Sequence, residues 1–556
     1  MSLESRLDAL SRGWRAPLLA ALIAMIAGLP GLFAVPPLDR DESRFAQATA
    51  QMIESGDYVV IRFQDQPRFK KPVGIHWMQA ASVTLLSAVE DRQIWAWRIP
   101  SLLGAMMAAA ACAWGAGAFF RQRTALIAGA ILGASFLLST EAFIAKTDAM
   151  LCGLTTLSLA ALARLYAAAN GGAKAGLWTR LFFWLSLSLG VLVKGPVSLL
   201  VVVLALVALC AWDRKWAWLR GLGWTWGTAI FVLVVAPWAW AITVATDGAF
   251  WGTAIGGDLA PKLAGGHESH GAPPGYHTLL SFLLTFPSAL LLPAGLALGW
   301  KRRNEPGVRF ALCWLIPTWL MFEILPTKLA HYTLPAHGAL AWLMAASIEG
   351  PLGRVSRWIG AALGVLGGVV FAAATIYLLS EYGDAADVTA AAITAGLFLF
   401  AGAIGAYLLV NRAAGTAIVT ALVLGVLAHS AFFTLFAPRL EPLWSSKRVA
   451  DVLREHRIDP RDGVTPGPVE VAGYAEPSLV FALGARTGLG DAPNAAQAVI
   501  EGRPAVVEAA QDADFRAALA RIGLTPRPVG VVDGFNYSTG DPVRLTVYRG
   551  EPEPNQ

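Results

Sequence analysis

The sequence predicts an α-helical, polytopic membrane protein with juxtamembrane helices on one face and a small α/β domain at its C-terminal end. Composition carries this prediction: 56% of the 556 residues are hydrophobic, only 15% are charged, and the mean hydropathy is +0.54. A soluble domain has about 25% charged residues. Apolar runs long enough to cross a bilayer recur along the chain, without the alternating pattern of a membrane barrel, so we expect helical spans.

These apolar runs predict about thirteen membrane spans. They cover residues 16–36, 97–120, 124–141, 149–169, 180–193, 196–212, 222–245, 278–300, 307–325, 332–348, 356–380, 388–411 and 415–437. The first run is long and has no clear small-residue cleavage site, so we expect an uncleaved anchor. All four cysteines fall within apolar runs, which predicts neither disulfides nor a thiolate metal site.

One further apolar stretch, residues 74–90, decides the orientation, because a crossing there would move every later loop to the other side. If it does not cross, the loops of one side carry most of the basic residues, as cytoplasmic loops do. Those residues are Arg121, Arg123, Lys174, Arg180, Arg214, Lys215, Arg220, Lys301, Arg302, Arg303, Arg309, Arg354, Arg357 and Arg412. We therefore predict a juxtamembrane helix at 74–90, a cytoplasmic N-terminus and a periplasmic C-terminal domain.

Two domains are predicted. Residues 1–437 form the transmembrane domain, whose first periplasmic loop is 37–96, and residues 438–556 form a periplasmic α/β domain. In the second domain the expected strands are 468–474, 505–507, 529–532 and 543–548, and the expected helices lie near 446–456, 494–501 and 512–522. It contains no metal spacing or phosphate loop, so we expect a cap or a substrate-guiding domain.

The polar corners predicted on the periplasmic face carry the residues best suited to chemistry. In the first loop, a helix with an apolar stripe begins at Asp41 and is expected to stop at Gly56. The candidate residues of this loop are Asp41, Glu42, Arg44, Lys70 and Lys71. Those of the later corners are Asp148, Lys194, Lys328, His331 and Tyr332. Their convergence on one face favours a site for a charged, lipid-linked substrate.

Each candidate has a chemical role and a simpler alternative. Asp41 or Glu42 can serve as a base, a metal ligand or a stabiliser of positive charge on a sugar ring, or can merely favour the start of the helix. Lysines suit a phosphate as point charges, but they also contact lipid headgroups or snorkel to the interface. On a helix, Lys328 and Tyr332 share a face, where a cation and a phenol suit phosphate oxygens.

Histidines gather in the longest loop of the same face, at positions 267, 270 and 277, with Glu268 between them. Histidines and a carboxylate can bind a divalent metal such as Zn, Mg or Mn. The spacing matches no strong metal signature, and solvated loop histidines are the simpler interpretation. No cofactor is therefore certain from the sequence.

Taken together, several motifs resemble the lipid A aminoarabinose transferases. That family is related to the protein O-mannosyltransferases, within the membrane glycosyltransferases that use polyprenyl-phosphate sugars. The motifs are Asp-Glu-Ser-Arg-Phe-Ala at 41–46, Ser55-Gly56-Asp57, Phe69-Lys70-Lys71-Pro72, Lys194-Gly195, and residues 328–332 followed by Leu334-Pro335. They occur in order over roughly residues 16–340, and they are specific only as a set.

The resemblance implies a fold of the GT-C type and a multi-pass enzyme of the bacterial inner membrane. Such an enzyme transfers one sugar from a polyprenyl-phosphate donor to lipid A or another envelope acceptor on the periplasmic side, with inversion. Asp41 would match the catalytic aspartate and Lys71 the lysine near the donor phosphate. Lys328 and Tyr332 would match a corner that also holds phosphate, and His270 a metal-site histidine.

The chain departs from this family at Lys70. The aminoarabinose transferases have Glu before Lys-Pro, so here a cation replaces a proposed metal carboxylate. That change leaves both the metal and the donor open, and it suits a more anionic donor or acceptor, such as a uronic acid sugar.

Three other functions remain open from the sequence. A protein O-glycosyltransferase would use the same residues with a different acceptor. A secondary transporter for a lipid-linked or anionic substrate is less favoured, because transporters place ionisable residues near the midplane and often have two related halves. A lipid-binding scaffold without activity is the third. The net charge of +5 is attributed to cytoplasmic loops that face membrane lipids, and no nucleic-acid partner is expected.

Overall fold

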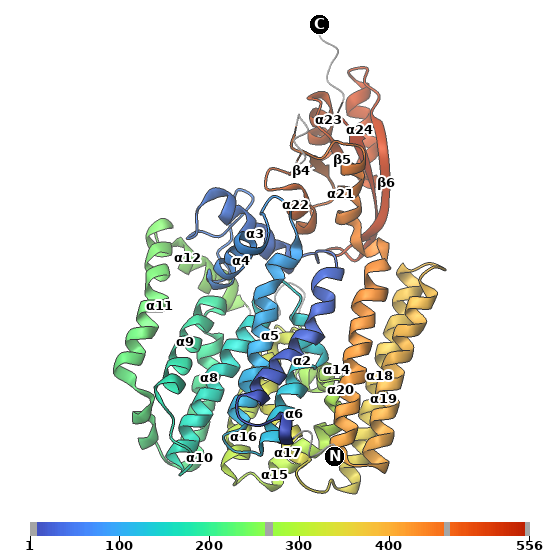
Figure 1. Ribbon diagram of the computed structural model, residues 1–556. Coiled ribbons are helices and arrows are strands. Elements are labelled where there is room, and N and C mark those ends of the chain that lie inside the picture. Colours follow the sequence, from blue (N-terminus) through green and yellow to red (C-terminus); the bar gives the residue numbers. More distant parts are fainter. Residues whose placement is uncertain (1–7, 262–270, 461–466, 551–556) are drawn as a thin grey trace.

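A computed structural model describes residues 8–261, 271–460 and 467–550 of the chain. Within this part, nine helices are long and apolar enough to cross a membrane. They are α2 (Arg15–Ala34), α5 (Ile94–Ala116), α8 (Asp148–Ala169), α9 (Leu177–Lys194), α11 (Trp224–Ala245), α16 (Pro306–Ile324), α18 (Arg354–Tyr382), α19 (Val388–Asn411) and α20 (Ala414–Ala431) with its extension to Arg439. The helices run roughly side by side in one bundle (Figure 1). The predicted class, a helical polytopic membrane protein, is confirmed.

Fewer helices than the predicted thirteen or so are long and apolar enough to count as spans, because several expected spans are short or broken. α14 (Tyr276–Leu284) and the segment Ser288–Lys301, which contains η3 and α15 (Leu292–Lys301), form a bent pair at 114° that makes a tenth span if counted as one. α10 (Val197–Asp213) is apolar but short. The remaining breaks separate α6 (Gln122–Gly133) from α7 (Phe136–Glu141), and the 3-10 helix η4 (Ala330–Ala336) from α17 (His337–Ser347).

The first loop forms two helices that lie at one end of the bundle, beneath the C-terminal domain (Figure 1). They are α3 (Asp41–Ser55) and α4 (Gly74–Leu86), joined through the short hairpin β1 (Arg62–Phe63) and β2 (Gln66–Pro67). α3 stops at Gly56, whose φ of 71° is left-handed, as the sequence predicts. α4 has 13 residues, about 20 Å of helix, too short for a hydrocarbon core of about 30 Å.

Beyond α20 the chain builds a mixed five-stranded sheet with helices around it. The strand order is β4-β3-β5-β7-β6, parallel among the first three strands and antiparallel among the last three. The strands are β3 (Glu470–Ala472), β4 (Gly488–Gly490), β5 (Ala505–Glu508), β6 (Arg527–Asn536) and β7 (Asp541–Arg549). The helices are α21 (Ser445–Glu455), α22 (Pro477–Leu483), α23 (Ala492–Ile500) and α24 (Ala509–Ala520). The sequence predicts all of these elements except β4 and α22.

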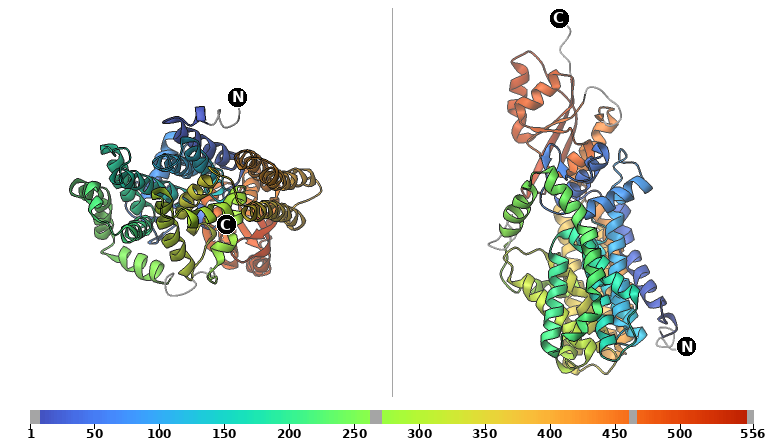
Figure 2. Two further views of the ribbon diagram at one scale, coloured as in Figure 1. Left: turned by 90° about the horizontal axis from the view of Figure 1, so that it is seen from below. Right: turned by 90° about the vertical axis from the view of Figure 1, so that its left-hand side faces the viewer.

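The C-terminal domain and the start of α2 lie at opposite ends of the molecule (Figure 2). We call the end that carries this domain, α3 and α4 the domain face. A small apolar core joins the domain to the bundle there: Phe481 of α22 packs with Ala46 and Ala50 of α3 and with Trp97 of α5. The domain is therefore packed directly onto the first loop.

Candidate functional site

Five charged or titratable side chains from three corners of the bundle form one network of close contacts. The ammonium of Lys146 lies 3.0 Å from Glu141 Oε1 and 3.6 Å from Asp148 Oδ2. The ammonium of Lys194 donates to Asp148 Oδ1 at 2.5 Å. His331 lies 3.6 Å from Asp148 through Nε2 and 3.7 Å from Glu141 through Nδ1. We call these five residues the central cluster, and it contains three of the predicted site residues.

The helix ends place this cluster. Asp148 opens α8, where the helix dipole favours an anion, and Lys194 closes α9, where it favours a cation. Gly195 follows with a φ of 61°, so the chain turns sharply after the lysine. Asp148 and Lys146 are buried, and close pairing is what makes such burial tolerable.

The electrostatics of the cluster keep Lys146 charged and His331 neutral. Burial lowers the pKa of Lys146, but the charges of Glu141, Asp148 and Asp41 outweigh burial and raise this pKa above its ordinary value. For His331, burial outweighs the attraction of Asp148 and lowers the pKa well below its ordinary value. A neutral imidazole can offer one donor and one acceptor to a ligand.

Asp41 is the exposed carboxylate of this region. It is the first residue of α3, and its charge acts on the ammonium of Lys146. The residue before it, Arg40, has a φ of 61°, an uncommon conformation for a non-glycine residue, so the chain turns abruptly into the helix. Asp41 thus combines exposure with an electrostatic interaction with a buried cation, as suits a reacting carboxylate.

Glu42 is placed differently, although the sequence groups it with Asp41 as a catalytic candidate. Its side chain is buried, and both of its oxygens accept hydrogen bonds of 2.8 Å from the guanidinium of Arg98. They also accept bonds from the amides of Ala145 at 2.7 Å and Leu38 at 2.8 Å. Each oxygen of Glu42 thus already accepts two hydrogen bonds, an arrangement that favours a positioning role.

Lys71 reaches toward the long loop of the domain face. Its ammonium lies 2.8 Å from Asp258 in the segment Gly252–Leu259, and Phe69 packs edge-on against Phe250 nearby. Lys70 and Arg44 are half-buried on the same face. The first loop therefore brings its predicted cations to this end of the molecule, with Lys71 tied to a carboxylate that the sequence does not identify as its partner.

Lys328 and Tyr332 do not share one face of an α-helix, contrary to the prediction from the sequence. Lys328 precedes the 3-10 helix η4, so the α-helical spacing that would align it with Tyr332 does not exist. The Lys328 ammonium is buried and donates to the carbonyl of Leu325, just past the end of α16. Tyr332 turns toward the central cluster instead, with the Lys194 ammonium 5.5 Å from its ring centroid.

A metal site finds no support among the described residues. His270 lies outside them, and the part that is described contains no group of three or more His, Cys, Asp or Glu suited to a metal ion. His277 is buried and held by the carboxylate of Glu323 and the carbonyl of Leu329. In the central cluster two ammonium groups already neutralise the carboxylates of Glu141 and Asp148, so that donor set does not fit a divalent cation.

Sequence reasoning missed Glu141, Arg98 and Asp258 as parts of this site. Glu141 and Arg98 are charged residues inside or at the edge of apolar runs, and such residues are functional candidates in a membrane protein. That signal was present for both. Asp258 carried no such signal, because a carboxylate in a polar loop is ordinary.

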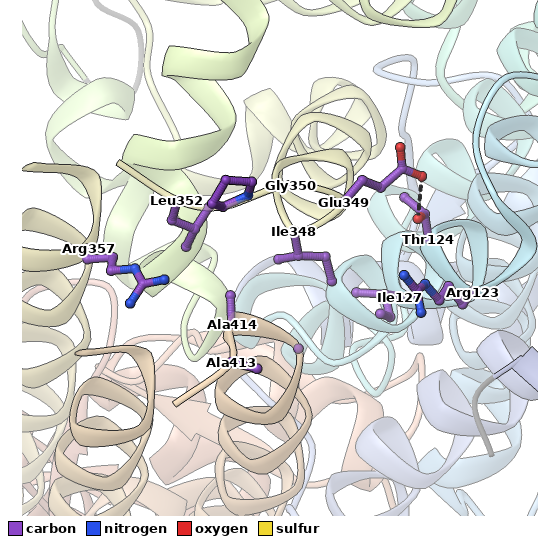
Figure 3. A pocket seen from close by; sticks show the side chains of 12 residues that line it. Arg123, Thr124, Ile127, Ile348, Glu349, Gly350, Leu352, Arg357, Ala413 and Ala414 are labelled. Carbon is purple, nitrogen blue, oxygen red and sulfur yellow. Dashed lines mark hydrogen bonds between the residues drawn. The ribbon is translucent and has the colours of Figure 1, made fainter. Parts of the chain in front are cut away.

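Two cavities lie outside the central cluster. One, of about 660 Å³, lies between the first loop and the C-terminal domain and is lined by Asp39, Arg92 and Lys447 among others. The other, of about 210 Å³, lies between α6, the start of α18 with the segment before it, and the start of α20 (Figure 3). There Glu349 accepts a hydrogen bond of 2.7 Å from the hydroxyl of Thr124. Neither cavity is lined by a predicted site residue.

Comparison with known proteins gives matches to polyprenyl-phosphate-dependent transferases. The family model described as dolichyl-phosphate-mannose-protein mannosyltransferase matches residues 82–250. An undecaprenyl phosphate-α-4-amino-4-deoxy-L-arabinose arabinosyl transferase from Pseudomonas paraeruginosa is 31% identical over 56% of this chain and 57% of that protein. Its namesake from Pectobacterium atrosepticum is 29% identical over 60% of each chain. These matches cover less than two thirds of either relative.

The fold extends the likeness over the whole chain. The crystal structure of ArnT from Cupriavidus metallidurans bound to undecaprenyl phosphate matches with a TM-score of 0.74 at 20% identity, covering 97% of this chain and 99% of that one. The apo structure of the same protein matches with a TM-score of 0.72. The resemblance predicted from the motifs is thereby confirmed: this chain has the fold of the aminoarabinose transferases and is similar to them in sequence over more than half of its length.

Proposed function

We propose that this protein transfers a sugar from a polyprenyl-phosphate donor to lipid A or another envelope acceptor, with inversion, at the periplasmic face of the bacterial inner membrane. The observation that carries the proposal is the exposed carboxylate of Asp41, whose neighbour Glu42 accepts a hydrogen bond from the amide of Ala145, the residue before the buried Lys146. The similarity to proteins named as undecaprenyl phosphate-aminoarabinose transferases supports the choice of donor. In this orientation the domain face is periplasmic and the N-terminus is cytoplasmic, as the distribution of basic loops favours.

In the proposed reaction, an acceptor oxygen forms a bond to the anomeric carbon while the bond from that carbon to the phosphate oxygen breaks. Asp41 takes the proton of an acceptor hydroxyl as general base. If the acceptor is a phosphate of lipid A, no proton has to be removed, and Asp41 then orients the acceptor or stabilises the charge that develops on the sugar ring. The polyprenyl phosphate leaves with the bonding electrons.

The negative charge of the leaving phosphate is stabilised by preorganised cations. We assign this role to Lys194, supported by Lys71 and Arg44 from the first loop. Lys328 and Tyr332 complete the phosphate site, the lysine as a buried charge and the phenol as a donor.

The remaining candidates support this site. Asp148 holds the ammonium of Lys194 at 2.5 Å, and the neutral His331 lies beside both. Lys70 adds a positive charge that suits an anionic group on the donor or acceptor. Glu42 is assigned a positioning role, since Arg98 occupies its oxygens.

A protein acceptor is the second candidate, favoured by the match to the mannosyltransferase family model over residues 82–250. Both candidates are tested by incubating the purified chain with a labelled polyprenyl-phosphate sugar and either lipid A or a Ser/Thr-rich peptide. We expect the label on lipid A. Label on the peptide would favour the second candidate, and release or binding without transfer to either acceptor would contradict both.

Replacing Lys194 by Met is expected to lower kcat by about 10²-fold, the usual cost of losing one preorganised charge-stabilising group. The fold should persist, because Lys146 still neutralises Asp148. Initial rates at saturating donor measure the effect. Lys174→Met, an exposed lysine in another loop, is the matched control and should stay within twofold of the wild type. Equal rates for Lys194→Met and wild type would remove Lys194 from the phosphate site.

A further inference from the structure

The C-terminal domain contacts the two residues that precede the proposed base. The amide of Ser478, in α22, donates to Asp39 Oδ1 at 3.1 Å. The guanidinium of Arg40 donates to the carbonyl of Ser538, in the turn between β6 and β7, at 3.0 Å. The amide of Ser538 in turn donates to Glu476 Oε1 at 3.0 Å, so the same turn is fixed within the domain.

These contacts act on a strained point of the backbone. Arg40 has φ 61° and ψ −108° and directly precedes α3. A non-glycine residue keeps such a conformation only where its surroundings over-determine it. On the other side of Asp41, Glu42 is fixed by Arg98. Asp41 therefore lies between a residue held by the C-terminal domain and a residue held by the bundle.

The domain also holds the rest of the first loop. Phe481 of α22 is fully buried against α3 and meets the ring of Trp97 at 5.3 Å between centroids. In the β1–β2 hairpin, the side-chain amide of Gln64 donates to the carbonyls of Thr487 at 2.7 Å and Ala485 at 3.3 Å. Three separate parts of the loop are thus tied to one rigid unit.

We infer that the C-terminal domain is a positioning element of the transfer reaction, which sets the direction of the Asp41 carboxylate through Arg40 and Asp39. The inference rests on the proposed function and assigns Arg40 and Asp39 no contact with substrate. Holding a general base in its productive direction lowers the barrier without changing how tightly the donor binds. If these contacts are lost, we therefore expect kcat to fall and KM to stay unchanged.

Arg40→Gly tests the inference, because glycine accepts a φ of 61°, so the turn can still form while the side-chain contact with Ser538 is lost. We expect kcat to fall at least tenfold while KM for the donor stays within twofold, and Arg40→Lys to recover part of the loss. Arg457→Gly is the matched control for the added backbone freedom: Arg457 is an exposed arginine of the C-terminal domain with a φ of 55°.

Two results would overturn the inference. One is a folded Arg40→Gly protein with wild-type kcat, and the other is a parallel change of kcat, KM and melting temperature, which would show a merely structural role. Failure of the proposed function is distinguished by the wild type, which would then transfer no sugar in the same assay. Hydrogen exchange of the amides of residues 38–44 gives an independent readout, and we expect faster exchange in Arg40→Gly than in Arg457→Gly.

The same contact should depend on pH. Burial and the nearby Glu476 carboxylate raise the pKa of Asp39 to about 7, against the hydrogen bonds from Ser478. Burial raises the pKa values of the nearby Tyr474 and Tyr537, and the charge of Asp39 raises them further. Between about pH 4 and pH 7, folded Asp39 keeps a proton that the unfolded residue, with a pKa of about 4, has lost. The protonated form stabilises the folded state, and this contribution to stability is lost as the pH rises from about 4 to 7.

We accordingly expect the amides of residues 38–44 to be better protected, after correction for intrinsic exchange, at about pH 5 than at about pH 8. Asp39→Asn keeps a neutral side chain at either pH and should remove most of this difference. A pH difference of the same size in Asp39→Asn would show that another group is responsible.

Discussion

Asp41→Asn is expected to lower the rate of sugar transfer by about 10²–10⁴-fold, the usual contribution of a positioned general base. The substitution keeps the size and exposure of the side chain but removes its charge and its ability to accept the acceptor proton. The measurement is the initial rate at saturating donor, with lipid A as acceptor. A larger loss with a hydroxyl acceptor than with a phosphate acceptor would identify the base role specifically.

Asp65→Asn is the matched control for this prediction, since Asp65 is an exposed carboxylate of the same loop, between β1 and β2. It should retain full activity. A folded Asp41→Asn protein that transfers sugar at the wild-type rate would contradict the assignment of Asp41, whatever the control shows.

Arg98→Met is expected to lower the free energy of unfolding by about 3–5 kcal/mol, because it leaves the charge of Glu42 buried and unpaired. Both side chains are inaccessible to solvent. Arg98 also donates to the carbonyl of Val35 at 2.6 Å and to that of Pro36 at 3.0 Å, past the end of α2, so the anchor helix loses its tie to the first loop. Equilibrium unfolding in detergent measures the effect.

Two further variants serve as comparisons for Arg98→Met. Arg62→Met removes an exposed arginine whose guanidinium lies 4.0 Å from Asp57, and we expect a change of at most about 1 kcal/mol. The double variant Arg98→Met, Glu42→Leu removes both charges and should recover part of the lost stability. A loss for Arg98→Met no larger than that for Arg62→Met would show that the buried pair does not hold the loop.

Much of the architecture follows from the sequence because hydropathy and capping are local signals. Apolar runs identify the long spans, and Gly56 marks the end of α3 in both the sequence and the structure. β4 could not be predicted: it is the three residues Gly488–Gly490, with little strand propensity, and it exists through parallel pairing with β3. The prediction of thirteen spans counted broken stretches, such as α6 and α7, as full ones.

The candidate site was predictable in its residue types but not in its pairing. Charges at helix ends identified Asp148 and Lys194, which the structure joins at 2.5 Å. The family resemblance pointed to Asp41 alone, but the local residue pattern could not separate Asp41 from Glu42, because only the fold places Arg98 against the second of these carboxylates. The partnership of Lys71 with Asp258 joins positions far apart in the chain, and no local pattern predicts such a pair.

The measurement that tests the central claim most directly is the position of the lipid phosphate when the protein is bound to undecaprenyl phosphate, determined by cryo-electron microscopy. Our account predicts the phosphate at the domain face, within hydrogen-bonding distance of Lys194 and on the same side of the bundle as Asp41. A phosphate bound at the opposite end, for instance beside Arg123 and Arg357, would contradict it.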